Sequence, residues 1–288
     1  MILVTGATGD IGGQLCELLK ANDIPFRAMC RKQPQIDRFR DRGIEAVPGD
    51  FSDPSSLPSA MQDCDRLFLI TPPSPEQVMW ETRAIDAAKQ AGIQYIVKIS
   101  ASDSNLASPV PWAKSHAEID HYLRGSGVEW TILKPTAFMQ NFLSLSRPIA
   151  RGILPQVAGR GKVGYIDTRD VAQVAYRVLV EDHHKRATYF LTGPEVLTME
   201  EIAGQLSAVL GKKVRYLNLP STVFRLMLRV SGLSGWFARG LVVQFADVVA
   251  GGHAMDTNEE VARLANRPPR TFRDFAREHR DRFPGNSA

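Results

Sequence analysis

Met1-Ile-Leu-Val-Thr-Gly-Ala-Thr-Gly-Asp-Ile-Gly-Gly13 is the stretch that decides the fold of this 288-residue chain. A short apolar run leads directly into three glycines, at Gly6, Gly9 and Gly12. Glycine lets the backbone turn tightly, approach a pyrophosphate and open a helix whose free N–H groups hold the anion. Apolar residues then recur at helical spacing. The stretch therefore predicts the start of a dinucleotide-binding βαβ unit, and the alternative is a glycine-rich turn without a ligand.

Beyond this stretch, short apolar runs alternate with helical patterns. Strands are expected at Ile2–Val4, Pro25–Cys30, Glu45–Val47, Arg66–Ile70, Tyr95–Ser100 and Trp130–Leu133. Helices are expected at Asp10–Ala21, Pro34–Arg42, Ser55–Met61, Glu76–Ala91 and Pro111–Gly125. This alternation predicts an α/β fold with a doubly wound parallel sheet. Right-handed crossovers place its ligand crevice at the carboxyl ends of the strands.

The alternation weakens after Pro135, which predicts a smaller C-terminal region. We assign residues 1–150 to a Rossmann-like NAD(P)-binding domain, to which part of 151–195 returns, and 196–288 to a mostly helical substrate-binding region. Further strands are expected at Thr188–Thr192 and Lys213–Leu217, and a helix with a capping box at Thr198–Leu210. The apolar segment Val223–Gly252 either lines a substrate cleft or packs in a core.

Composition is that of an ordinary globular protein, with 44% hydrophobic and 23% charged residues. The net charge of +4 is spread without long like-charged blocks, so we expect no nucleic-acid partner. The three cysteines form no Cys-x-x-Cys pair, which predicts reduced thiols and a cytoplasmic location. The first strand begins at residue 2, so no secretory signal is expected.

Three other classes of site or segment have weak support. The most apolar late stretch, 241–250, is short and contains Asp247, so we expect no integral membrane segment. His183 and His184 lie beside Asp182, but adjacent side chains of a helix diverge, so we expect no metal site. The sequence has no Gly-x-Ser-x-Gly elbow, so a hydrolase is not indicated.

The ends of the second and third strands bear on the choice of nucleotide. Arg31 follows the second strand, where an NAD-selective site usually has an acidic residue for the ribose 2′-hydroxyl. Arginine at this place favours a 2′-phosphate, hence NADPH over NADH, unless Arg31 and Lys32 are only solvated cations. Asp50 and Phe51 follow the third strand and either contact the adenine edge or, through Asp50, cap the next helix.

Four segments carry a resemblance to a known family. They are Thr5-Gly-Ala-Thr-Gly-x-x-Gly12, Gly49-Asp-Phe51, Leu133-Lys-Pro-Thr-Ala-Phe-Met-x-Asn141 and Asp167-x-x-Asp-Val-Ala172. Together they resemble the NmrA-like atypical short-chain dehydrogenase/reductases over nearly the whole chain. Similar members include NAD(P)H quinone reductases, azo- and triphenylmethane-dye reductases and isoflavone-type reductases. Other members bind the nucleotide as redox-sensing regulators without known turnover.

NADP is therefore the expected cofactor, as NADPH. The predicted contacts lie in the glycine turn and at the ends of the later strands: Thr5, Gly6, Thr8, Gly9, Asp10, Ile11, Gly12, Arg31, Asp50, Phe51, Thr71, Pro72, Pro135 and Thr136.

The superfamily's Tyr-x-x-x-Lys pair is missing from this sequence. The matching helix reads Trp112-Ala-Lys-Ser-His116, which puts tryptophan at the tyrosine position and histidine at the lysine position. Trp112 and His116 share a helix face, whereas Lys114 points roughly 200° away from Trp112 and is expected to be solvated. His116 is predicted to bond the nicotinamide ribose or supply a proton, and the alternative is an ordinary helix-face histidine.

Ser100 is the second predicted catalytic residue, because it ends the fifth strand at the crevice. Its hydroxyl either steadies a substrate oxygen or caps a loop. The predicted substrate contacts are Ser102, Trp112, Phe138, Met139 and Asn141. For Trp112, a packing role is the alternative.

The sequence thus predicts an NADPH-dependent reductase that sends hydride to a small, flat, conjugated acceptor such as a quinone, an azo or triarylmethane dye, or an enone. A conjugated acceptor spreads the incoming charge, so a dedicated phenolic acid is not required. The alternatives are a nucleotide-sensing protein without turnover and a nucleotide-sugar isomerase or epimerase. The sequence leaves a homodimer open.

Overall fold

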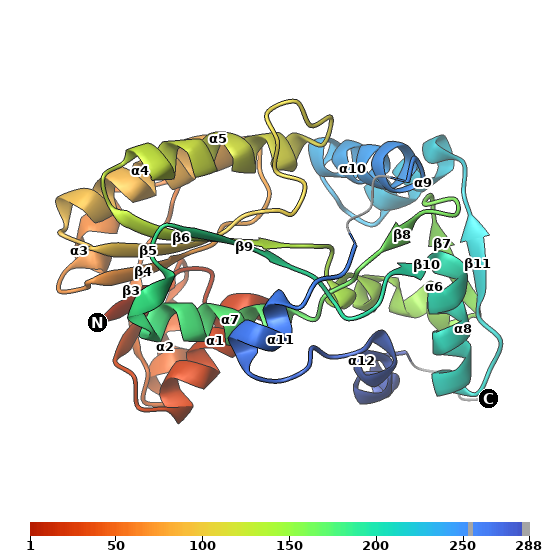
Figure 1. The fold of residues 1–288 in the computed structure, drawn as a ribbon, viewed down its shortest axis with the longest axis horizontal. Coiled ribbons are helices and arrows are strands. Elements are labelled where there is room, and N and C mark those ends of the chain that lie inside the picture. The colour runs from red at the N-terminus through yellow and green to blue at the C-terminus, as the bar shows by residue number, and fades with distance from the viewer. Residues whose placement is uncertain (253–255, 284–288) are drawn as a thin grey trace. The chain divides into compact units, whose positions relative to one another are not determined.

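A computed structural model describes residues 1–252 and 256–283 of the chain. The chain forms two compact units (Figure 1). The first unit comprises Met1–Ser108, Trp112–Lys134 and Val171–Phe190, and the second comprises Pro109–Pro111, Pro135–Asp170 and Leu191–Ala288. Each unit is described separately below.

The first unit is built on a seven-stranded sheet in the order β3-β2-β1-β4-β5-β6-β9. Its strands are β1 (Ile2–Val4), β2 (Phe26–Cys30), β3 (Glu45–Pro48), β4 (Arg66–Leu69), β5 (Tyr95–Ile99), β6 (Glu129–Pro135) and β9 (Ala187–Leu191). The neighbouring strands from β1 to β6 pair in parallel. This arrangement confirms the expected doubly wound fold, whose strand order reverses between β1 and β4.

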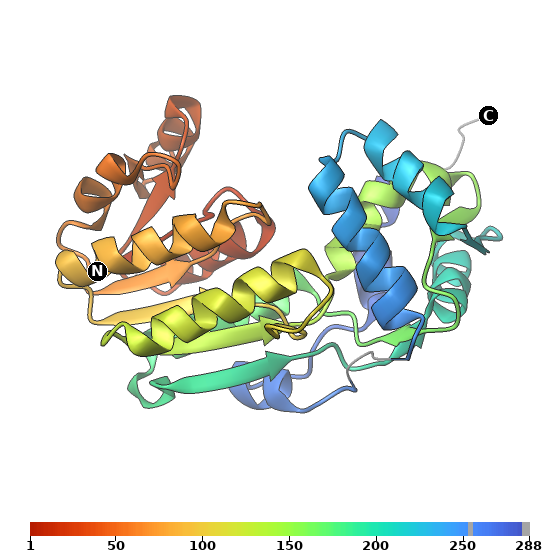
Figure 2. The ribbon, with the colours of Figure 1, turned by 90° about the horizontal axis from the view of Figure 1, so that it is seen from above.

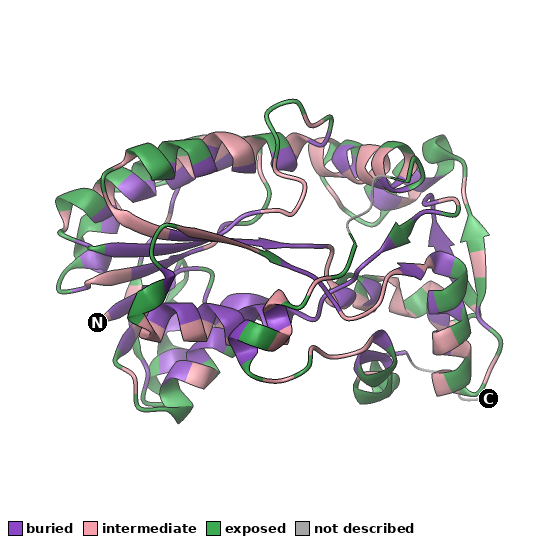
Figure 3. Ribbon diagram, viewed as in Figure 1, coloured by how far each residue is buried: buried purple, intermediate pink, exposed green. Residues whose placement is uncertain are grey.

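Helices cover both faces of this sheet. They are α1 (Asp10–Ala21), α2 (Gln33–Arg40), η1 (Pro54–Ser56), α3 (Leu57–Met61), α4 (Gln77–Gln90), α5 (Pro111–Gly125), α7 (Thr168–Val180) and η3 (Asp182–His184). Figures 1 and 2 show α4 and α5 on one face and α1, α2 and α7 on the other. The covered strands β1, β4 and β5 are buried almost throughout (Figure 3), as expected for strands that lie between two helical layers.

Two predicted elements differ in the structure. The helix expected at Ser55–Met61 is divided into η1 and α3. Pro58 has no N–H group, so it cannot donate the helical hydrogen bond to the carbonyl of residue 54. The strand expected at Thr188–Thr192 is found one residue earlier as β9, which lies beside β6 at the end of the main sheet.

The second unit has two small sheets and a set of short helices. Its strands are β7 (Ile153–Gln156), β8 (Lys162–Val163), β10 (Leu197–Thr198) and β11 (Arg215–Asn218). Its helices are η2 (Met139–Leu145), α6 (Ser146–Ala150), α8 (Met199–Leu210), α9 (Ser221–Val230), α10 (Gly235–Val242), the π-helix η4 (Val243–Val249), α11 (Glu260–Ala265), α12 (Phe272–Glu278) and η5 (Arg280–Arg282). β7 pairs with β11 in parallel, and β8 pairs with β10 antiparallel. The predicted capping box is present, because Thr198 and Glu201 exchange hydrogen bonds at the start of α8.

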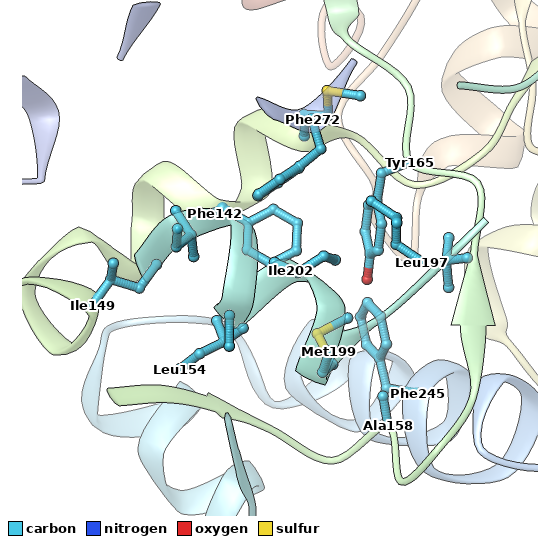
Figure 4. Packing of buried hydrophobic residues seen from close by; sticks show 14 of the residues in the cluster. Phe142, Ile149, Leu154, Ala158, Tyr165, Leu197, Met199, Ile202, Phe245 and Phe272 are labelled. Atoms are coloured by element: carbon cyan, nitrogen blue, oxygen red, sulfur yellow. The ribbon is translucent and has the colours of Figure 1, made fainter. Parts of the chain in front are cut away.

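Aromatic side chains hold the core of the second unit together. The ring of Phe142 lies edge-on to those of Tyr165 and Phe272, with centroids 5.0 Å apart in both pairs (Figure 4). The same core takes in Phe224 from α9 and Phe245 from η4. Packing therefore accounts for the buried residues of the apolar segment that begins at Val223.

Two further expectations concern the state of the cysteines and the presence of a membrane-spanning helix. Cys16, Cys30 and Cys64 are free and buried. Within residues 1–252 and 256–283, no helix combines the length and the apolar character needed to cross a bilayer.

Candidate functional site

The glycine turn between β1 and α1 is too tightly packed to accept a side chain at two of its positions. Gly6 has φ +59°, and a Cβ atom there would lie 2.6 Å from Cγ2 of Ile70. A Cβ atom on Gly12 would lie 2.3 Å from the carbonyl oxygen of Gly6. Glycine is therefore favoured at Gly6 by its positive φ and required at Gly12 by close approach of the backbone. Gly6, Thr8, Gly9 and Asp10 are exposed, so the turn presents its backbone to solvent.

The N-terminus of α1 is suited to an anion. Gly9 is its N-cap residue and has no side chain with which to cap the helix. The free amides of the first turn and the helix dipole together favour a phosphate group. Ile11 and Gly12 are buried beneath the turn, so they contribute backbone and packing rather than exposed side chains.

Thr5 joins the glycine turn to the end of β4. Its hydroxyl donates to the carbonyl of Phe68 at 2.9 Å, and it accepts from the N–H of Ile70 at 2.9 Å. The side chain is fully buried, so Thr5 fixes the geometry of the crevice instead of offering its hydroxyl to a ligand. Thr71 and the exposed Pro72 follow β4, which lies next to β1 where the strand order of the sheet reverses.

Arg31 and Asp50 follow neighbouring strands, β2 and β3. Arg31 is exposed, whereas Asp50 is half-buried and its Oδ1 accepts from the Ser52 N–H at 2.9 Å and the Ser52 hydroxyl at 2.8 Å. The Ser52 N–H is the main cause that lowers the pKa of Asp50, and the charge of Arg31 adds to it. Phe51 packs into the sheet core, so only its backbone is available at the crevice.

A buried network of charged side chains lies behind the carboxyl ends of β4, β5 and β6. Lys98 on β5 is fully buried, and its Nζ lies 3.5 Å from Oε2 of Glu81 and 3.3 Å from Oδ1 of Asp120. Nζ of Lys134, at the end of β6, lies 3.5 Å from Oδ2 of Asp120. Two lysines thus face two carboxylates, and this balance offsets the cost of removing the charges from water.

Hydrogen bonds tie the ends of the strands to the network. The hydroxyl of Thr71 donates to Oε1 of Glu81 at 2.5 Å. The hydroxyl of Ser100 donates to Oδ2 of Asp120 at 2.8 Å. Ser100 is 3% exposed, so its hydroxyl is directed into the network and not into solvent.

His116 belongs to the same network. Nζ of Lys98 lies 3.0 Å from its Nδ1, and the side-chain amide nitrogen of Gln77 lies 3.4 Å from its Nε2. Burial lowers the pKa of His116 well below its usual range, and the charges of Lys98 and Lys134 lower it further. The ring is therefore neutral near pH 7, and its Nδ1 accepts a hydrogen bond from Lys98.

Sequence reasoning missed most of this network, namely Glu81, Lys98, Asp120 and Lys134. A lysine within the apolar run of β5 was one available signal, because a charged residue in a buried strand needs partners. Asp103 was also missed. It follows β5 and lies half-buried, and burial raises the pKa of its carboxyl.

The remaining predicted residues fall into both units. In the first unit, Trp112 is buried on the same face of α5 as His116, Ser102 is half-buried and Lys114 is exposed as expected. In the second unit, Phe138 is half-buried, Met139 is buried in the core and Asn141 is exposed. Pro135 and Thr136 are buried, and the Thr136 hydroxyl donates to the carbonyl of Gly164 at 2.5 Å.

The histidines after α7 are held by hydrogen bonds. Nε2 of His184 lies 3.1 Å from Oε2 of Glu181, and its Nδ1 lies 2.9 Å from the hydroxyl of Tyr189. Ligand atoms of Glu181, His183 and His184 lie within 4.8 Å of one another. Asp182, which the sequence placed beside the histidines, pairs with Arg66 instead.

The whole chain is similar to known proteins in sequence and in structure. A family model described as the NmrA-like family matches residues 1–243. The chain is 34% identical over 288 residues to an NAD(P)H azoreductase of Xenophilus azovorans, covering 98% of this chain and 99% of that protein. The solved NADPH complex of an Escherichia coli quinone oxidoreductase is similar with a TM-score of 0.87 at 28% identity, covering 98% and 100% of the two chains. A Citrobacter sp. triphenylmethane reductase complexed with NADP(H) has a TM-score of 0.87 at 25% identity, covering 96% and 99%.

Proposed function

Because this chain belongs to the NmrA-like family, whose relatives include NAD(P)H reductases, we propose that it transfers hydride from NADPH to a conjugated acceptor. The acceptor classes are quinones, azo or triarylmethane dyes, and enones. The relatives are named azoreductase, quinone oxidoreductase and triphenylmethane reductase, and azo compounds, quinones and triarylmethane dyes are all conjugated acceptors. The observation that carries the proposal is the exposed glycine turn at the uncapped start of α1.

The nucleotide would be held along the carboxyl ends of β1 to β4. The amides after Gly9 would bind the pyrophosphate, because the tight turn that Gly6 and Gly12 allow leaves the start of α1 exposed. The exposed guanidinium of Arg31 would bind a 2′-phosphate, which supports a preference for NADPH. Asp50 would accept from the adenine edge with the oxygen that Ser52 does not use.

When bound, NADPH supplies the hydride, and the protein supplies position and electrostatics. His116 is neutral and Ser100 points at Asp120, so we assign both to positioning: they hold the lysines and carboxylates that support the ends of β5 and β6. A conjugated acceptor disperses the developing charge, so water can deliver the proton. Ser102, Trp112, Phe138, Met139 and Asn141 stay our predicted substrate contacts.

The first experiment is oxidation of NADPH by the purified protein across a panel of quinones, dyes and enones, followed through the near-ultraviolet absorbance of the cofactor. Binding of NADPH is measured in parallel by titration. Turnover with any acceptor class supports the reductase. Tight binding with no turnover across the panel would instead favour the nucleotide-sensing alternative.

Nucleotide preference is tested with Arg31→Gln, using Arg38→Gln on the exposed face of α2 as the matched control. A charge-assisted contact to a phosphate contributes about 1.5–3 kcal/mol, so Arg31→Gln should weaken NADPH binding by about 10- to 100-fold. NADH binding should change little. Equal affinities of both variants for NADPH would remove Arg31 from the site.

The role of the buried network is tested by comparing His116→Ala with Lys114→Ala. We expect His116→Ala to lower turnover because the imidazole contacts Lys98, whereas Lys114 is exposed on the opposite side of α5. If His116 is a positioning residue, the substitution should lower the turnover rate at every pH but leave the shape of the pH profile unchanged. Equal and negligible effects would remove His116 from the mechanism.

A further inference from the structure

Residues 202–246 of the second unit form an uninterrupted cationic segment. They contain six basic residues and no aspartate or glutamate: Lys212, Lys213, Arg215, Arg225, Arg229 and Arg239. This segment carries a charge of +6 whereas the whole chain has a net charge of +4, so the remaining residues together are slightly negative. The positive charges of Arg225 and Arg229, both exposed, attract an anionic partner and repel the same residues of a second copy.

The helix α9 within this segment has two apolar faces. Phe224 and Leu228 point into the core of the unit. Val223, Leu226 and Val230, at helical spacing i, i+3 and i+7, are 48%, 64% and 81% exposed. A helix that only packed on a core would have polar residues at these positions.

The arginines of α9 lie at the edge of this exposed apolar stripe. Arg225 and Arg229 are exposed and four residues apart, so they share one side of the helix. Leu217 on β11, 47% exposed, adds an apolar side chain just before α9. α9 also packs against α10 (Figure 2), while the stripe stays exposed.

We propose that the stripe Val223, Leu226 and Val230, with Arg225 and Arg229, docks on an anionic membrane surface. Such a helix lies in the plane of the headgroups, with its apolar residues among the upper acyl carbons and its arginines at the phosphates. The three apolar side chains are exposed on one side of α9, so they are available to the boundary of a bilayer. This binding goes beyond the proposed reductase function and needs no cofactor or acceptor.

The test is sedimentation of the full-length protein with vesicles. One set is phosphatidylcholine alone, and the other is phosphatidylcholine and phosphatidylglycerol in equal parts. Binding is expected to the anionic vesicles only and should weaken as salt shortens the screening length from about 30 Å at 0.01 M to about 8 Å at 0.15 M. Arg225→Gln and Arg229→Gln should each reduce partitioning by about fivefold.

The apolar stripe is tested with Leu226→Gln. Its matched control is Leu106→Gln, because Leu106 is a leucine of similar exposure, 60%, in the first unit. Leu226→Gln should lower vesicle binding at least fivefold, whereas Leu106→Gln should leave it unchanged. Circular dichroism and NADPH titration check that each variant is folded.

Three results would overturn the proposal. The first is failure of the wild-type protein to bind anionic vesicles at low salt. The second is a dimer, detected by light scattering, that Leu226→Gln dissociates, since that would assign the stripe to a second copy. The third is unchanged vesicle binding by Leu226→Gln together with lost turnover of a water-soluble quinone, which would assign the stripe to substrate. Because vesicle binding requires no turnover, failure here leaves the reductase proposal standing.

Discussion

Removing the charge of Lys98 should destabilise the first unit strongly. Its Nζ lies 3.5 Å from Glu81 and 3.3 Å from Asp120, and all three side chains are buried. At an effective dielectric constant of about 20, each such pair attracts by about 5 kcal/mol. Most of this attraction offsets desolvation, and removal of one partner of a buried pair typically costs about 3–5 kcal/mol. We expect Lys98→Met to lose at least this much, a large part of the 5–15 kcal/mol typical of a whole domain.

A second substitution separates lost charge balance from lost packing. In Lys98→Met/Glu81→Gln, the pair of Asp120 and Lys134 remains and position 81 is neutral. The double variant should therefore recover about 2 kcal/mol relative to Lys98→Met, although the single substitution Glu81→Gln is itself destabilising. Lys89→Met, on the exposed part of α4, is the control and should change stability by no more than about 0.5 kcal/mol.

The assay is urea unfolding followed by circular dichroism, with the free energy extrapolated to water. The reasoning would be refuted by a loss below about 1 kcal/mol for Lys98→Met. It would also be refuted if the double variant lost as much as the two single variants together, because that would show no interaction between Lys98 and Glu81.

Two further predictions concern the glycine turn and His116. Gly12→Ala places a Cβ atom 2.3 Å from the carbonyl oxygen of Gly6, so it should weaken NADPH binding more than tenfold in a fluorescence titration. In the control Gly13→Ala, the nearest contact of the new Cβ atom is 3.4 Å away, so the affinity for NADPH should change by no more than about threefold. Equal losses of affinity in the two variants would argue against a close backbone turn. For His116, the folded-state pKa is depressed, so below about pH 6.5 the unfolded chain takes up a proton that the folded protein does not. Stability should fall by up to about 1.4 kcal/mol per pH unit below pH 6.5, and His116→Gln should reduce this slope in unfolding curves; an unchanged slope would contradict a neutral buried ring.

Local patterns were sufficient to predict the frame of the first unit. The helix α1 runs from Asp10 to Ala21 as expected, because the glycine turn marks its start and its apolar residues keep one period. The helix α5 also has the expected bounds, and the six expected strands lie within a residue or two of those found. These features depend on neighbours in sequence, so a single chain reveals them.

The buried network depends on neighbours in space and could not be read in the same way. Glu81 occupies the apolar face of α4 together with Ala84, Ile85 and Ala88, and Asp120 occupies the apolar face of α5. Each was a charged residue at a core position, which signals that a partner exists. The identity of that partner, Lys98, follows only from the strand order that brings β5 beneath both helices.

The order of segments along the chain has a consequence for synthesis on the ribosome. The last two strands of the main sheet are β6 and β9, but residues 135–170 of the second unit are synthesised between them. At about 5–20 residues per second, several seconds separate the synthesis of Pro135 from that of Leu191. Throughout that interval the nascent sheet ends at β6, whose unpaired N–H and C=O groups form a free edge open to pairing with another chain. Pairing with β9 then satisfies these groups of β6, and the outer edge of β9 becomes the end of the sheet.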